Sequence, residues 1–248
     1  MKLIRCSGNG RVFFGVLDGE IVREIKGGKE ISDEEQKLSE LKILPPCYPS
    51  KIVAVGLNYR DHAKEMKLPM PEEPVLFIKP STSIIAHEEE IIYPSMSKRV
   101  DYEAELGVVI KKRAKGITEK EAPDYILGYT CFNDVTARDL QKQDGQYTRS
   151  KGFDTFAPLG PYIETNVDPG QLRVEAYLNG ERKQSSDTKK LIFSVFHLVS
   201  FISHIMTLLP GDVIATGTPS GVGPMSVGDT IEVKIEGIGT LKNRVVAR

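Results

Sequence analysis

Residues 172–183 have the sequence LRVEAYLNGERK, and this stretch decides the class of fold. Every second residue from Leu172 to Leu178 is apolar, which is the pattern of an antiparallel strand with one buried face. Asn179-Gly180 follows, a dipeptide favoured in two-residue hairpin turns because both positions require positive φ. The segment therefore predicts an antiparallel hairpin.

Strand patterns recur through the rest of the chain, whereas long helical patterns are few. A doubly wound parallel sheet needs helices between its strands, so this order of elements argues against one. We expect an α+β fold, mostly β, built on antiparallel or mixed sheets. The other strands expected beyond residue 50 are Lys51–Val55, Val75–Lys79, Tyr102–Lys111, Ile126–Phe132, Asp212–Thr216 and Thr230–Val246.

The first fifty residues are expected to form a small unit of their own. A polar helix is predicted with Ser32 as its N-cap, because Glu35 three residues later completes a capping box. Strand patterns precede it at Lys2–Arg5, Arg11–Leu17 and Glu20–Glu24, and Asp18-Gly19 is the expected hairpin turn between the last two.

Prolines 45, 46 and 49 follow this unit and mark the only plausible domain boundary in the chain. We therefore predict a small N-terminal β-rich domain at residues 1–49 and a larger domain at residues 50–248.

The composition excludes several classes of protein. The 33 Lys and Arg residues nearly balance the 34 Asp and Glu residues, for a formal net charge of -1. Proteins that bind nucleic acid usually have a basic excess, so no such partner is expected. The 3 cysteines have no CxxC spacing, which predicts neither a disulfide framework nor a thiolate zinc site and favours a cytoplasmic protein.

The stretch Leu191–Leu209 contains no Asp, Glu, Lys or Arg and is the one candidate for a membrane span. Polar residues recur in it every three or four positions, however, and would form a stripe along a helix. We expect a buried amphipathic helix that ends at Pro210-Gly211, and no membrane association.

Residues 101–110, DYEAELGVVI, carry the first chemical signal. In a strand, Glu103 and Glu105 would lie on the same face, about 6.6 Å apart along the chain. If that face is buried, the two carboxylates need a cation, and hard oxygen ligands suit Mg²⁺, Mn²⁺ or Ca²⁺. If it faces solvent, they are two ordinary surface residues, and spacing alone does not decide between these interpretations.

Asp134 favours the first interpretation, because it ends an apolar strand at 126–132 where a carboxylate needs a partner. It is equally well placed to act as the N-cap of a helix that starts at Val135. With Glu103 and Glu105 it would complete an oxygen-rich site for an octahedral cation that also accepts substrate oxygens.

Three further segments carry polar residues. His62 and Glu65 lie three residues apart in a short helix expected to be capped by Asn58, where a carboxylate would make the imidazole a better base. Lys151 lies in a loop, where a lysine is usually a solvated charge. The glycine-rich segment 217–223 could present backbone N–H groups to a carboxylate, or simply be a tight turn.

Taken together, these segments resemble the fumarylacetoacetate hydrolase family. Seven motifs occur in the family's order over about residues 50–248: NYRDHAKE, EPVLFIKPS, DYEAELGVVI, GYTCFNDVTARDLQ, SKGFDTFAPLGP, LNGE and GDVIATGTPSGVG. The resemblance implies the family's mixed β-sandwich roll, usually as a homodimer, with a small N-terminal domain.

The resemblance also implies residue roles. Glu103, Glu105 and Asp134 would ligate Mg²⁺, or Mn²⁺ or Ca²⁺ in its place. His62 and Glu65 would form a dyad that activates water. Lys151 would lie near the substrate as a catalytic residue. The expected substrate contacts are Gln141, Thr155 and Thr218.

One departure separates this chain from the larger fumarylacetoacetases, which carry a fourth acidic ligand upstream of the catalytic histidine. The corresponding segment here, 52–57, contains no acid. We therefore expect a smaller member with a small anionic keto acid as its substrate. The predicted activity is metal-dependent hydrolysis of a carbon–carbon bond in acylpyruvates or fumarylpyruvate, which gives pyruvate and a carboxylic acid.

Two other activities fit the same metal site, because they also pass through an enolate. They are the isomerisation of 2-hydroxyhepta-2,4-diene-1,7-dioate and an oxaloacetate-type decarboxylation. A protein that binds a metal or metabolite without catalysis is a third alternative, but it would have no need of His62, Glu65 and Lys151.

Overall fold

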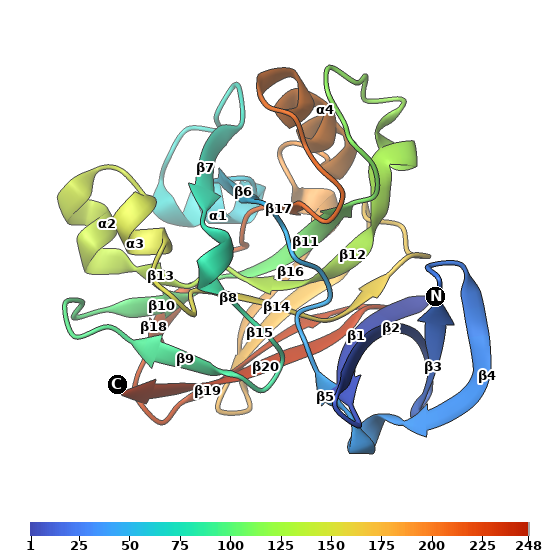
Figure 1. Cartoon of the computed structure of the whole chain (residues 1–248). Coiled ribbons are helices and arrows are strands. Elements are labelled where there is room, and N and C mark those ends of the chain that lie inside the picture. The colour runs from blue at the N-terminus through green and yellow to red at the C-terminus, as the bar shows by residue number, and fades with distance from the viewer. Residues whose placement is uncertain (248) are drawn as a thin grey trace.

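The computed structural model describes residues 1–247 and is mostly β, with three sheets and short helices around them (Figure 1). The predicted fold class is therefore confirmed.

The largest sheet has twelve strands, and its main path runs from the N-terminal strands to the strands that carry the candidate site. Short strands β5 (Lys42–Ile43) and β8 (Ile84–Ile85) pair with its members at the sides. In spatial order the path is β4 (Glu30–Lys37), β3 (Ile21–Lys26), β2 (Arg11–Asp18), β1 (Lys2–Gly8), β14 (Ala157–Glu164), β12 (Ile126–Asn133), β11 (Ala104–Ile110), β17 (Val213–Ala215), β6 (Ile52–Gly56) and β7 (Val75–Lys79).

Two smaller sheets complete the β structure. The five-stranded sheet has the order β16 (Glu181–Asp187), β15 (Arg173–Leu178), β19 (Thr230–Ile235), β20 (Gly239–Ala247) and β9 (Glu90–Tyr93). The three-stranded sheet has the order β13 (Thr136–Ala137), β10 (Val100–Tyr102) and β18 (Gly223–Met225).

The hairpin predicted at residues 172–183 is confirmed as β15 and β16, which pair antiparallel with Leu178 opposite Glu181. Its two turn residues, Asn179 and Gly180, have φ values of 53° and 81°, as a turn of this type requires.

Helices are short and lie around the sheets. The α-helices are α1 (Arg60–Met66), α2 (Arg138–Asp144), α3 (Thr148–Lys151) and α4 (Val195–Ile205), and the 3-10 turns are η1 (Leu38–Glu40), η2 (Ser81–Ser83), η3 (Ala122–Tyr125) and η4 (Thr188–Lys190).

Helix α4 is the amphipathic helix predicted within Leu191–Leu209, although it is shorter than that stretch. It begins after Ser194, whose side chain accepts a hydrogen bond from the His197 N–H, and its buried residues include Leu198 and Ile202. Within residues 1–247 the structure contains no helix with the length and apolar character that crossing a membrane requires.

The helix predicted after Ser32 is wrong, because residues 30–37 form strand β4. Arg23 of β3 pairs with Glu35, so the two residues of the supposed capping box belong to a sheet. The Ser32 hydroxyl does accept a local hydrogen bond, from the Glu34 N–H, but pairing with β3 overrides this helix signal.

The N-terminal strands join the main sheet through β1, which pairs with both β2 and β14. They also enclose a small apolar cluster of their own, which includes Ile4, Cys6 and Val22. A division of the chain after residue 49 stays a prediction.

The candidate site depends on the position of β11, a fully buried strand of the main sheet. All seven of its residues are buried, and it lies between β12 and β17. Leu106 and Val108 pack into one apolar cluster while Val109 packs into another, so both faces of the strand are covered. Side chains at the start of β11 are therefore held by packed structure on all sides.

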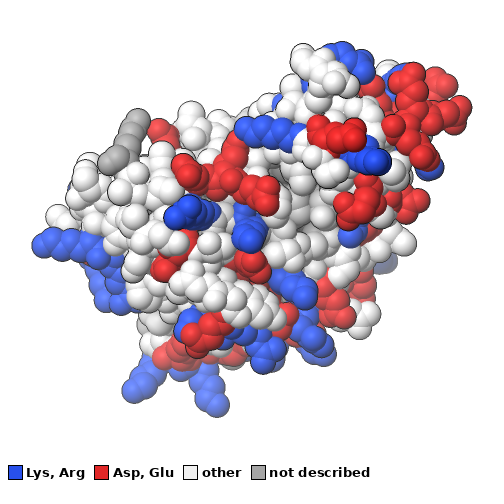
Figure 2. All heavy atoms as spheres, turned by 90° about the horizontal axis from the view of Figure 1, so that it is seen from below, with Lys and Arg blue, Asp and Glu red and all other residues white. Residues whose placement is uncertain are grey.

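The face of the molecule drawn in Figure 2 carries charged side chains of both signs, with uncharged areas between them. On the face shown in Figure 2, lysines and arginines are interspersed with aspartates and glutamates, as the near-zero net charge leads one to expect.

Candidate metal centre and active site

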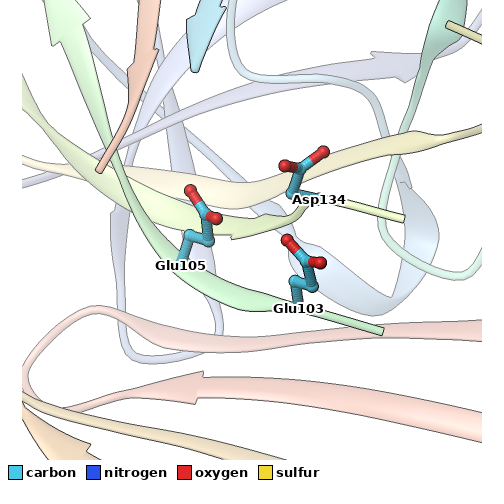
Figure 3. A group of neighbouring side chains, drawn as sticks. All are labelled: Glu103, Glu105 and Asp134. Carbon is cyan, nitrogen blue, oxygen red and sulfur yellow. The ribbon is translucent and has the colours of Figure 1, made fainter. Parts of the chain in front are cut away.

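Three carboxylates meet where β11 and β12 lie side by side (Figure 3). One oxygen from each of Glu103, Glu105 and Asp134 can be chosen so that all lie within 4.8 Å of one another. Glu103 is 6% exposed and Glu105 1%, so the interpretation of this segment as a solvent-facing edge is wrong.

Backbone pairing explains why residues so distant in sequence meet. Ala104 of β11 is opposite Asn133 of β12, which places Asp134 beside Glu103. The Asp134 N–H donates to the Glu103 carbonyl at 2.9 Å, and the Glu103 N–H donates to Oδ1 of Asn133 at 3.0 Å. Glu103 itself lies between β10 and β11, where the chain passes from one sheet to another.

Asp134 is not a helix cap. The next residues form strand β13, and helix α2 begins only at Arg138, with no side-chain hydrogen bond at its N-terminus. The carboxylate of Asp134 instead contacts two buried ammonium groups, Lys79 Nζ at 2.5 Å from Oδ1 and Lys151 Nζ at 2.5 Å from Oδ2.

Glu103 is also paired with cations. Lys151 Nζ lies 2.8 Å from its Oε2, and Arg138 donates from Nη2 to its Oε1. Burial alone would raise the pKa of Glu103, but Lys151 and then Arg138 outweigh burial and lower that pKa to about 2.

Glu105 differs from the other two carboxylates because no ion pair to it occurs among residues 1–247. Its Oε2 accepts the Gly217 N–H at 2.8 Å. Burial, followed by the charges of Asp134 and Glu103, raises the pKa of Glu105 well above its usual value. A cation beside this carboxylate would stabilise its charged form.

The donor set fits a hard divalent cation. All three residues offer carboxylate oxygens, which Mg²⁺, Mn²⁺ and Ca²⁺ prefer, and the cluster contains no thiolate or imidazole that would favour a softer metal. Glu103, Glu105 and Asp134 are the residues that would hold such an ion.

A cavity of about 140 Å³ opens beside the three carboxylates. Five more polar side chains, five apolar side chains and Tyr147 also line it. The polar ones are His62, Arg138, Gln141, Lys151 and Thr218; the apolar ones are Val55, Leu57, Met66, Leu68 and Phe77.

The predicted dyad lies at this cavity. Nδ1 of His62 is 3.0 Å from Oε2 of Glu65, one turn along α1. The Gly221 N–H donates to both oxygens of Glu65 at 3.2 and 3.3 Å, so the glycine-rich segment does present a backbone donor to a carboxylate. Because Nδ1 is engaged, Nε2 is the nitrogen of His62 that can exchange a proton with a substrate.

Asn58 does not cap α1, contrary to the sequence prediction. Tyr59 is the residue before the helix, and Asn58 is fully buried. Its amide donates to the Thr216 carbonyl at 2.8 Å and accepts the Phe193 N–H at 2.8 Å. Asn58 therefore fixes the start of α1, and with it His62, to distant segments of the chain.

Of the three expected substrate contacts, Gln141 and Thr218 line the cavity and Thr155 does not. Gln141 lines the cavity and accepts a hydrogen bond from Arg138 at 2.6 Å. Thr218 lines it too, but its hydroxyl already donates to the Ala104 carbonyl at 3.0 Å. Thr155 is outside the lining, and its hydroxyl accepts the Ile92 N–H at 2.9 Å.

The sequence analysis missed two functional cations, Lys79 and Arg138. Lys79 could have been identified by the reasoning that identified Asp134. Lys79 ends the apolar strand β7, on the same face as Phe77, and a charged residue in that position needs a buried partner.

Comparison with known proteins shows the family of the chain. Residues 51–246 match the family described as "Fumarylacetoacetate (FAA) hydrolase C-terminal", and residues 1–46 match "Rv2993c-like, N-terminal".

Three similar proteins illustrate the range of reactions. A structure described as 5-carboxymethyl-2-hydroxymuconate delta-isomerase from Mycobacterium smegmatis has a TM-score of 0.94 and 43% identity, over 100% of this chain and 99% of the other. The human mitochondrial oxaloacetate tautomerase FAHD2B is 42% identical over 84% of this chain and 70% of its own length. A maleylpyruvate hydrolase structure from Sphingobium has a TM-score of 0.86 and 27% identity, with 100% of both chains covered.

Proposed function

Because this chain belongs to the fumarylacetoacetate hydrolase family, we propose that it is a divalent-metal-dependent enzyme that transfers a proton at the carbon beside the keto group of a small 2-oxo acid. An acid of the oxaloacetate type is the proposed substrate. One observation carries the proposal: His62, whose Nδ1 is held by Glu65, lines the same cavity of about 140 Å³ as the three carboxylates.

The size of the cavity supports a small substrate. Ligand pockets for drug-sized molecules usually measure about 300–1,000 Å³, and a cavity of about 150 Å³ is enough for a molecule such as benzene. The names of two relatives above 40% identity, a tautomerase and an isomerase, also support proton transfer.

In the proposed reaction, His62 Nε2 removes a proton from the carbon beside the keto group and returns it at another atom. Glu65 fixes the imidazole through Nδ1 and stabilises its protonated form, and Gly221 holds Glu65. Lys151 and Arg138 supply positive charge near the substrate carboxylate. A divalent cation held by the three carboxylates would supply Lewis-acid polarisation of a substrate oxygen.

Carbon–carbon hydrolysis, the activity first expected, is the second candidate. The same dyad can take a proton from water, and the maleylpyruvate hydrolase is a structural neighbour at lower identity. Hydrolysis needs room for water as well as for a longer diketo acid, which the small cavity does not favour.

Nuclear magnetic resonance in D₂O separates the candidates. With Mg²⁺ present, we expect fast exchange of the C3 hydrogens of oxaloacetate and an accelerated approach to the keto–enol equilibrium. Rapid release of pyruvate and a carboxylic acid from acylpyruvates, without exchange on oxaloacetate, would contradict the proposal and favour hydrolysis. Fast pyruvate formation from oxaloacetate would indicate decarboxylation.

Calorimetry tests the metal site separately. A Glu103→Gln, Glu105→Gln double variant should lose measurable Mg²⁺ binding. Unchanged affinity in this variant would place the metal elsewhere.

A further inference from the structure

Two aromatic side chains, Phe77 and Tyr147, line the candidate active-site cavity and also line a second, larger cleft. That cleft measures about 720 Å³, against about 140 Å³ for the active-site cavity. Residues shared by two neighbouring cavities lie between them. We infer that this ring pair is an internal wall that limits the length of the substrate.

The geometry of the pair fits a wall. The ring centroids are 5.2 Å apart and the planes meet at 83°, an edge-to-face contact of the kind that aromatic pairs prefer. Phe77 comes from β7 and Tyr147 from the segment between α2 and α3, so the wall joins two separate elements. Each ring is half-buried and is held by the other.

On the catalytic side, the wall stands close to the reacting groups. Lys151 Nζ lies 5.1 Å from the centre of the Phe77 ring, and the same ammonium contacts Glu103 and Asp134. A substrate held at the carboxylates therefore meets Phe77 within a few atoms of its keto group.

The larger cleft, on the other side of the wall, is lined by a different kind of residue from the active-site cavity. Among residues 1–247, those that line the larger cleft include no charged side chain. Val75, Leu76, Ile78 and Pro80 supply apolar surface, and Gln146 and Thr148 are the polar residues beside them. Apolar surface of this kind would stabilise an apolar tail and would not hold a second carboxylate. The native protein thus takes 2-oxo acids with a compact far end, and removal of either ring would admit those with an apolar tail.

The inference rests on the proposed function, and a comparison of two substrates tests it. The probes are oxaloacetate and 2-oxo-4-phenylbutanoate, with C3-hydrogen exchange as the measure of kcat and KM and calorimetry as the measure of affinity. In Phe77→Ala, the kcat/KM ratio of the long acid to oxaloacetate should rise about 10–100-fold, mainly through a lower KM for the long acid.

Tyr147→Ala opens the same wall from its other side and should shift the ratio in the same direction. This variant keeps the test valid if Phe77→Ala disturbs Lys151 or fails to fold. Ile78→Ala is the matched control, because Ile78 lines only the larger cleft and is 47% exposed. Its ratio should stay within about threefold of the native value.

The outcomes separate the two claims. Wild-type protein without exchange activity on either acid would contradict the proposed function. Wild-type activity on oxaloacetate, with both alanine variants keeping the native ratio and the native affinity for the long acid, would overturn the wall. A native protein that already prefers the long acid would overturn it as well.

Discussion

Nζ of Lys79 lies 2.5 Å from Oδ1 of Asp134, and both side chains are shielded from solvent, at 0% and 1% exposure. Lys79 also donates to the Val135 carbonyl at 3.1 Å. Burial is the main influence on Lys79 and lowers its pKa, although Asp134 opposes that effect. Removal of Lys79 would leave the buried Asp134 carboxylate with Lys151 as its one ion-pair partner within residues 1–247, which it shares with Glu103.

Lys79→Met should therefore lower the free energy of unfolding by about 3–5 kcal/mol, measured by urea denaturation with a chelator present. The Lys79→Met, Asp134→Asn double variant should recover most of that loss, because the carboxylate that lost Lys79 is now neutral and Lys151 keeps Glu103 as its partner. Lys234→Met, at an exposed lysine of β19, should change stability by less than about 0.5 kcal/mol. Equal losses in the single and double variants would contradict the pairing.

Removal of the metal should affect activity far more than folding. Three cationic side chains already compensate the charges of Glu103 and Asp134, namely Lys79, Lys151 and Arg138. The carboxylate cluster therefore does not depend on a metal ion alone for its stability. At an ion concentration of 100 Kd, binding adds about 2.7 kcal/mol, which corresponds to roughly 5–10 °C in Tm for a chain of this size.

Addition of EDTA should thus abolish exchange activity, while Tm should fall by no more than roughly 5–10 °C. Differential scanning calorimetry measures the shift, and added excess Mg²⁺ should restore both properties. A Tm that falls by tens of degrees would show that the ion holds the fold together.

His62→Ala should reduce turnover by roughly 10²–10⁴-fold, because it removes the group that transfers the proton. Mg²⁺ affinity should not change, since His62 is not part of the carboxylate cluster. His204→Ala is the matched control, an exposed histidine of α4 whose Nδ1 contacts only the Ser200 carbonyl. Turnover that survives in His62→Ala would remove the dyad from the mechanism.

The buried carboxylate of Asp212 should make stability depend on pH. It accepts hydrogen bonds from the backbone N–H groups of Ser50 and Leu209 and from Lys51 Nζ. Burial raises the pKa of Asp212, but Lys51 and these other donors outweigh it and lower that pKa below its usual value.

A lowered folded-state pKa means that Asp212 stabilises the fold above its unfolded pKa of about 3.9 and loses that effect as pH falls through the folded pKa. Asp212→Asn should cost about 2–3 kcal/mol at pH 7, and the difference from wild type should shrink at pH 3 and below. Urea denaturation at both pH values provides the measurement. A difference that does not vary with pH would rule out the carboxylate as its source.

The sequence indicated those parts of the molecule whose signals are local. The hairpin at Asn179-Gly180 and an amphipathic helix within Leu191–Leu209 follow from turn chemistry and periodicity within a few residues. Ser32 and Glu35 had an equally good local signal for a helix, but pairing with β3 outweighed it. A local pattern cannot show whether a neighbouring strand will compete for the same backbone groups.

Local sequence patterns were also insufficient to predict the whole of the candidate site. The family motifs pointed to the carboxylates and the dyad, but they left Lys79 unassigned because its role depends on β7 facing Asp134 across the fold. Asn58 resembled a helix cap, and only the structure shows it buried between residues 193 and 216. Contacts between segments that are distant in the sequence are therefore the hardest features to predict from a single sequence.

The parallel pairing of β6 with β17 has a consequence for the order of folding. The paired residues are far apart in the sequence: Ile52, Val53 and Ala54 of β6 pair with Val213, Ile214 and Ala215 of β17. Contacts between such distant segments form slowly, because a long loop must close first. A chain emerging from the ribosome would carry His62 and all three carboxylates long before β17 was available. Catalytic competence should therefore appear only after β17 has been synthesised, as a late step of folding.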